Sequence, residues 1–212
     1  MEIANNKINL VGTVTSEPEF SHEIIGEGFY SFYIKCSRKS SNVDTIPVLV
    51  SDRFPCFKDI KAGAFAEITG QIRSYNKHTE VKNKLILSVF AQSVSIVEDI
   101  ESATESCEYN NNAELDGYIC KLPIYRTTPQ GREIADFILA VNRPYGKSDY
   151  IPCIAWGRNA RFVGNLNVGD KIAVAGRFQS REYEKKIGDA AETRTAYELS
   201  TAKIALVAGS EE

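Results

Sequence analysis

The stretch Tyr150-Ile-Pro-Cys-Ile-Ala-Trp156 decides how this sequence is interpreted, because the chain carries a second version of it 105 residues earlier. Its core, Ile151-Pro-Cys-Ile-Ala155, aligns with Ile46-Pro-Val-Leu-Val50. The same offset, or one residue more, also aligns these pairs: Gly12 with Gly117, Phe32 with Phe137, Arg38 with Arg143, and Gly70 with Gly176. Order and spacing preserved over so many positions predict a tandem duplication of one domain.

Each copy has the pattern of a mostly β domain. In the second copy, apolar or alternating runs bounded by turn residues predict strands at 137–141, 150–156, 171–179 and 197–207. A short helix is predicted in 157–166, where apolar residues recur on one helical face. With one further strand before these four, the copy has five short strands and a helix between the third and fourth, which matches an all-β Greek-key barrel of the OB-fold type. The first copy gives the same order, with its helix expected near 54–62.

Composition shifts suggest where the two barrels begin and end. Residues 98–112 are acidic, rich in Asn and poor in apolar side chains, which is typical of a linker. We therefore expect a first OB-fold over 1–97, a second over 113–207, and a short acidic tail at 208–212.

The overall charge is nearly balanced, with 25 basic and 28 acidic side chains among 212 residues. That balance excludes a binder that works by bulk positive charge, but nucleic-acid binding depends on where the charges lie. The sequence has no apolar run of 18 residues, and its start lacks the pattern of a signal peptide. These features predict a cytosolic protein with no membrane partner.

Sequence motifs for catalysis or for metal and cofactor binding are absent. There is no phosphate-binding glycine loop, no HExxH pattern and no calcium-binding loop, and neither His22 nor His78 has a nearby nucleophile. The five cysteines form no CxxC pair, so Cys36, Cys120 and Cys153 are expected to act as small buried hydrophobes. The sequence therefore predicts a protein that is not an enzyme, with no cofactor and no metal.

Aromatic and basic side chains are interleaved in the second copy, as single-stranded nucleic acid requires. Unpaired bases stack on aromatic rings, at about 1–3 kcal/mol each, and cations follow the phosphates. Tyr150 and Trp156 share one face of a regular strand, although Trp156, at a strand end, fits a core ring equally well on pattern alone. The phosphate candidates are Arg143, Lys147, Arg158, Arg177, Arg181, Lys185 and Lys186.

Over residues 113–207 the second copy resembles the bacterial single-stranded DNA-binding protein (SSB) family. The motifs that carry the resemblance are Thr128-Pro-Gln-Gly131, Phe137-Ile-Leu-Ala-Val-Asn-Arg143, Tyr150-Ile-Pro-Cys-Ile-Ala-Trp-Gly157 and Gly176-Arg-Phe-Gln-Ser-Arg-Glu-Tyr183. The resemblance implies base stacking at four positions, which fall on Tyr145, Tyr150, Trp156 and Tyr183.

The resemblance also implies a role and an assembly. It implies binding of single-stranded DNA with little sequence preference, protecting it during replication, recombination or repair. Family members assemble four barrels, which for this chain implies a homodimer. The family's acidic tail ends in an aromatic tip that recruits other enzymes, whereas this chain has only Glu211-Glu212, which argues against recruitment by that route.

The first copy resembles the family more faintly and departs from it where binding residues would lie. Thr45, Ser51 and Lys77 stand at the positions of Tyr150, Trp156 and Tyr183. The weaker candidates that remain are Arg38, Lys39, Arg73, Tyr75, Lys77, Lys82 and Lys84. This pattern predicts a first copy that is mainly architectural or one that is limited to weak phosphate contacts.

Two other functions stay open at this point. The chain fits an OB-type protein-interaction module, such as a primosome or recombination accessory, in which the exposed aromatics contact a protein partner and DNA binding is weak. RNA binding also fits, because OB sheets accept either nucleic acid, and competition between matched DNA and RNA oligomers would separate the two.

Overall fold

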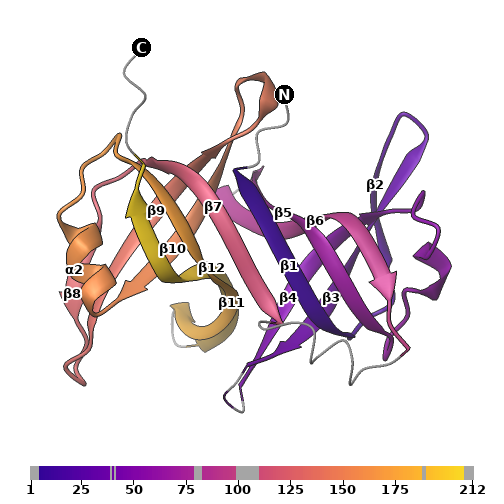
Figure 1. Ribbon diagram of the computed structural model, residues 1–212. Helices are drawn as coiled ribbons and strands as arrows, with labels where there is room; N and C mark the ends of the chain where they lie inside the picture. Colours follow the sequence, from indigo (N-terminus) through magenta and orange to yellow (C-terminus); the bar gives the residue numbers. More distant parts are fainter. Residues whose placement is uncertain are drawn as a thin grey trace.

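The computed structural model describes residues 5–38, 40, 42–78, 83–98, 110–187 and 190–207, which form two β-barrels (Figure 1). The first barrel consists of β1 (Asn6–Val14), β2 (Glu19–Ile24), β3 (Glu27–Ser37), β4 (Val43–Ser51), β5 (Phe65–His78) and β6 (Asn83–Ile96). The second consists of β7 (Asn111–Ile119), β8 (Ile124–Thr127), β9 (Glu133–Asn142), β10 (Ser148–Trp156), β11 (Lys171–Ile187) and β12 (Ala190–Leu206). Within the described residues, the helical elements are the 3-10 turns η1 (Phe57–Asp59) and η2 (Pro144–Gly146) and the helix α2 (Arg158–Gly164).

Both barrels close in the same order. In the first, β1 pairs with β3 and β5, and a parallel pairing of β4 with β6 completes the circle. In the second, β7 pairs with β9 and β11, and β10 runs parallel to β12. This Greek-key closure confirms the predicted pair of OB-folds. The short strands β2 and β8 are additions to the five that were expected: each pairs only with the following strand and is exposed throughout.

Equivalent glycines mark the duplication inside the barrels. The register shifts between Thr69 and Gly70 in β5, and between Ala175 and Gly176 in β11. A Cβ atom at Gly70 would collide with the carbonyl oxygen of Phe90, and one at Gly176 with that of Ser200. Glycine is needed at both bulges because the neighbouring backbone leaves no room for a side chain.

The expected helix is an α-helix in the second barrel and only a 3-10 turn in the first. Helix α2 directs Ala160 and Val163 into the core, as its spacing predicts. Residues 54–62 instead contain only the turn η1, whose hydrogen bonds all join residues three apart, including Phe57 N–H to the Phe54 carbonyl. Phe54, Phe57 and Ile60 recur every three residues, so 3-10 geometry already directs them to the core, and the short helix expected near 54–62 is a single 3-10 turn.

The cores are apolar and contain two of the thiols expected there. Cys36 and Cys153 are buried and Cys120 is half-buried, and none of the three is in a disulfide. Burial raises the pKa of the Cys36 thiol to about 12. Phe137 and Phe178 are buried, as expected for core rings. Most of the expected linker, 99–109, lies outside the described residues, and β7 begins at Asn111.

The barrels join edge to edge through an antiparallel pairing of β1 with β7 (Figure 1). Ile8 lies opposite Ala113, its own equivalent in the other copy, so a pseudo-two-fold axis passes between them. The result is one sheet of twelve strands that runs through both barrels. No helix in the described ranges is long and apolar enough to cross a membrane.

Candidate nucleic-acid interface

The outer surface of β10 presents two aromatic rings. Tyr150 is 47% exposed and Trp156 is 40% exposed, while Ile151, Cys153 and Ala155 between them are buried. The alternation of a regular strand therefore directs both rings outward, on the same face. Trp156 lies outside the core, and both rings are accessible to a flat ligand.

The other two stacking candidates lie outside β10. Tyr145 is 99% exposed in the turn η2, where it has a positive φ of 65°. Tyr183 is 39% exposed on β11, and the guanidinium of Arg181 lies 5.9 Å from its ring centre. Register places Ile154, Ser200 and Arg177 in one row across β10, β12 and β11.

Some of the basic candidates are free to meet a phosphate chain. Lys147 and Arg158 are exposed and form no ion pair within the described part of the chain. Arg181 is 56% exposed and lies 3.5 Å from the carboxylate of Glu198, which is buried. Lys185 and Lys186 lie on β11, but their side chains fall outside the described part of the structure.

Two other basic candidates converge instead on a buried carboxylate at the barrel junction. Asp149 in β10 has no solvent exposure. Arg143 donates to both of its oxygens, and Arg73 from the first barrel donates at 3.0 Å. The backbone N–H of Ser74, also from the first barrel, donates to Asp149 at 2.5 Å. The guanidiniums of Arg73 and Arg143 therefore neutralise a charge that would otherwise be buried alone.

The pseudo-two-fold axis repeats this cluster around Asp44 in β4. Asp44 is also fully buried, and Arg38 of its own barrel donates to it at 2.5 and 2.9 Å. Arg177 of the second barrel lies 3.1 Å from it, and the Ser180 N–H donates at 3.2 Å. Partial burial lowers the pKa of Arg177. These four arginines, Arg38, Arg73, Arg143 and Arg177, thus tie the barrels together.

The first-barrel candidates are more scattered. Tyr75 on β5 is exposed, and so is Lys84 on β6. Lys77 lies on β5 with its side chain outside the described part, and Lys39 and Lys82 lie outside the described residues. Thr45 and Ser51, which replace the stacking aromatics, are half-buried and buried.

Sequence reasoning missed Tyr33 on β3 and Tyr197 on β12, which line one groove between the barrels. Tyr33 is exposed between the buried residues Phe32 and Ile34. That alternation is visible in the sequence and marks an outward-facing ring. Its proximity to Tyr197 depends on how the barrels dock, which no local pattern reveals.

Closed five-stranded barrels with exposed aromatic and basic side chains on an outer face place this chain among the OB-fold proteins that present such a face to ligands. Residues 110–207 match the family model described as the single-strand binding protein family. The family match thus covers the C-terminal barrel of the chain. The family is non-enzymatic, as the missing catalytic motifs predict.

Individual relatives match the sequence of the chain over the same half. Single-stranded DNA-binding protein 1 of Staphylococcus aureus is 42% identical over 85 residues, which cover 37% of this chain and 51% of that protein. Single-stranded DNA-binding protein A of Bacillus subtilis is 40% identical over 85 residues, 37% of this chain and 49% of that protein. The match thus covers about half the length of these relatives.

A solved structure resembles the whole chain. The wild-type single-stranded DNA binding protein from Thermus aquaticus superposes with a TM-score of 0.76 at 17% identity, over 98% of this chain and 95% of that one. A deletion mutant of the same protein gives a TM-score of 0.74. At this identity the likeness establishes the fold, and it extends to both barrels.

Proposed function

We propose that this chain binds single-stranded DNA on the outer face of its second barrel, with little sequence preference. The observation that carries the proposal is the pair of exposed rings on one face of β10, Tyr150 and Trp156. Tyr145, in the turn before β10, and Tyr183, on β11, complete the proposed stacking surface. Every base has a π-face, so stacking on these rings discriminates little between bases.

The phosphate contacts in this proposal come from the cations that the junction leaves free. Lys147, Arg158 and Arg181 are exposed, and Lys185 and Lys186 follow Tyr183 on β11. We assign Arg143 and Arg177, together with Arg38 and Arg73, to the barrel junction, because buried carboxylates already hold them. Affinity should therefore fall as salt rises, through the smaller set of exposed cations.

The first barrel is mainly architectural in this proposal, with weak phosphate contacts near Tyr75, Lys77, Lys82 and Lys84. The biological role we propose is protection of single strands during replication, recombination or repair. Assembly of two chains into a four-barrel homodimer stays a prediction.

The single tryptophan allows a direct test, because Trp156 reports on its own surroundings. The protein is titrated with oligo(dT) at about 50 mM and about 300 mM salt, and with a duplex of equal length as control. We expect strong quenching of Trp156 fluorescence by the single strand, weaker at the higher salt, and little by the duplex. Absence of quenching, with no binding in an anisotropy assay at low salt, would reject the proposal and favour the protein-interaction module.

A further inference from the structure

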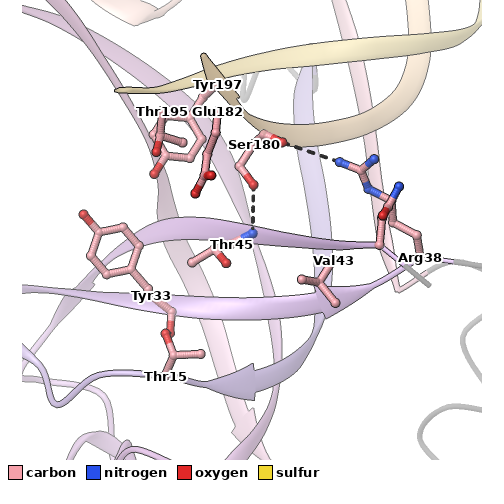
Figure 2. Close-up of a pocket in the computed structure, with 10 residues that line it drawn as sticks. Thr15, Tyr33, Arg38, Val43, Thr45, Ser180, Glu182, Thr195 and Tyr197 are labelled. Carbon is pink, nitrogen blue, oxygen red and sulfur yellow. Dashed lines mark hydrogen bonds between the residues drawn. The ribbon is translucent and has the colours of Figure 1, made fainter. Parts of the chain in front are cut away.

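A groove of about 730 Å³ lies between the outer face of the first barrel and the β11–β12 hairpin of the second (Figure 2). The first barrel contributes Tyr33 and Thr45, and the hairpin contributes Ser180, Glu182, Thr195 and Tyr197. The volume lies within the range of small-molecule sites in proteins. Arg38, which Asp44 holds, also lines the groove, and none of the residues assigned to DNA under the proposed function does.

Hydrogen bonds between the barrels hold the two walls of the groove in place. The Thr45 N–H donates to Ser180 Oγ at 3.0 Å, a bond drawn in Figure 2. Ser180 in turn donates its own N–H to the buried Asp44. The groove is thus a built feature of the docked barrels rather than a gap between independent units.

The two tyrosines supply aromatic surface from opposite walls. Tyr33 is 44% exposed, and its backbone N–H donates to Ser16 Oγ at 3.1 Å. The Tyr197 ring packs on the buried Phe178 ring with centroids 6.1 Å apart. In Figure 2 Tyr33 extends from the first barrel while Tyr197 and Glu182 extend toward it from the hairpin. Burial, and secondly the charge of Tyr33 when it ionises, raise the pKa of Tyr197 to about 12.

Glu182 adds an acceptor to this aromatic site. Its side chain is exposed and makes no hydrogen bond or ion pair within the described ranges. A carboxylate only accepts hydrogen bonds, so it favours a ligand edge that donates them. Glutamate in proteins accepts from the exocyclic amino group of cytosine in this way.

The pseudo-two-fold axis relates this groove to the proposed stacking surface of the second barrel. The bond from Thr45 N–H to Ser180 Oγ has its counterpart in the bond from Tyr150 N–H to Ser74 Oγ, at 2.8 Å. The groove in the first barrel is therefore the counterpart of the surface where Tyr150 is proposed to stack a base. The aromatic residue is absent from β4, where Thr45 stands, but Tyr33 provides one on the neighbouring strand.

We propose that this groove accepts one unpaired base of the DNA strand bound by the second barrel. The base lies against Tyr33 and Tyr197, and its exocyclic amino group donates to Glu182. Cytosine, adenine and guanine carry such a group, whereas the carbonyl oxygens of thymine would face the carboxylate. The inference rests on the proposed function and adds to it a second binding site with a base preference.

The test compares oligo(dC) with oligo(dT) of equal length, using the full chain and two variants that remove one negative charge each. Glu182→Ala removes the acceptor in the groove. Glu184→Ala is the matched control, because Glu184 lies on the same exposed hairpin and does not line the groove. Anisotropy gives the affinity, Trp156 fluorescence reports the second barrel, and 5-iododeoxycytidine in the oligomer allows photocross-linking.

We expect the unaltered protein to bind oligo(dC) with roughly three- to tenfold higher affinity than oligo(dT). This ratio corresponds to the net free energy of one hydrogen bond. Glu182→Ala should abolish this preference and Glu184→Ala should keep it, while cross-links form at Tyr33 or Tyr197. If Trp156 is quenched but Glu182→Ala leaves the base preference unchanged and neither tyrosine cross-links, the groove is not a base site and the proposed function stands. If no oligomer quenches Trp156 or binds, the proposed function and this inference both fail.

Discussion

Individual side chains at the second barrel are placed by strand alternation, and this part of the site could be predicted from sequence. Tyr150 and Trp156 lie six residues apart, an even spacing that keeps both on one face of β10. Tyr33 and Tyr197 lie 164 residues apart in sequence, and only the docked barrels bring them to one groove. Ring exposure is therefore a local property, whereas ring pairing is a tertiary one.

Tyr197 allows a prediction about pH at this scale. Its pKa is raised to about 12 from an ordinary value of 10, first by burial and second by Tyr33. The folded protein should therefore keep Tyr197 protonated above pH 10, and its stabilising contribution, complete below pH 10, should be lost as pH rises toward 12. NMR of the tyrosine ring carbons between pH 9 and 12 measures this.

Two further outcomes decide that prediction. Tyr33→Phe should lower the pKa of Tyr197 only partly, because burial is the larger cause. A Tyr197 signal that titrates near pH 10 in the folded, unaltered protein would contradict the placement of this ring against Phe178.

At the scale of whole elements, the two barrels are held together by two β-hairpins, one from each barrel. The β5–β6 hairpin brings Arg73 and Ser74 to Asp149, and the β11–β12 hairpin brings Arg177 and Ser180 to Asp44. The sequence pattern predicts that these arginines bind DNA phosphates, because basic residues interleaved with aromatic ones are typical of single-strand binding. The acidic partner of Arg73 lies 76 residues away, so the ion pair could not be recognised before the fold was known.

The junction predicts a large effect of Asp149→Ala on stability. The change leaves Arg73 and Arg143 without their partner at a partly buried site, which should cost about 3–5 kcal/mol of unfolding free energy. Asp136→Ala is the control, because Asp136 pairs with Arg126 at the surface and should change stability little. Urea unfolding of both variants measures the difference, and similar midpoints for the two would show that the junction is not a stabilising cluster.

The molecule as a whole is a duplicated barrel with a pseudo-two-fold axis but unequal surfaces. The internal repeat was sufficient to predict two OB-folds, since buried positions recur in both copies. The strands β2 and β8 were not predicted because all their residues are exposed, so no buried apolar position recurs along them. Their only support is the hydrogen-bonded strand beside them, and a periodicity argument cannot detect that.

The unequal surfaces lead to the central claim, that the second barrel is the main binding platform for single-stranded DNA. Its exposed rings stand where the first barrel has Thr45 and the buried Ser51. The whole chain should therefore lose most of its affinity when those rings are removed, although the first barrel and the junction stay intact.

The most direct test is the affinity of the full chain for oligo(dT), measured by anisotropy after Tyr150→Ala and Trp156→Ala, with Tyr118→Ala as control. Tyr118 is an exposed ring of the same barrel, on β7, that is not among the stacking residues. Each of the first two changes should weaken binding about tenfold, the value of one base–aromatic stack, and Tyr118→Ala should leave it unchanged. Equal affinities for all four proteins would contradict the stacking platform on β10.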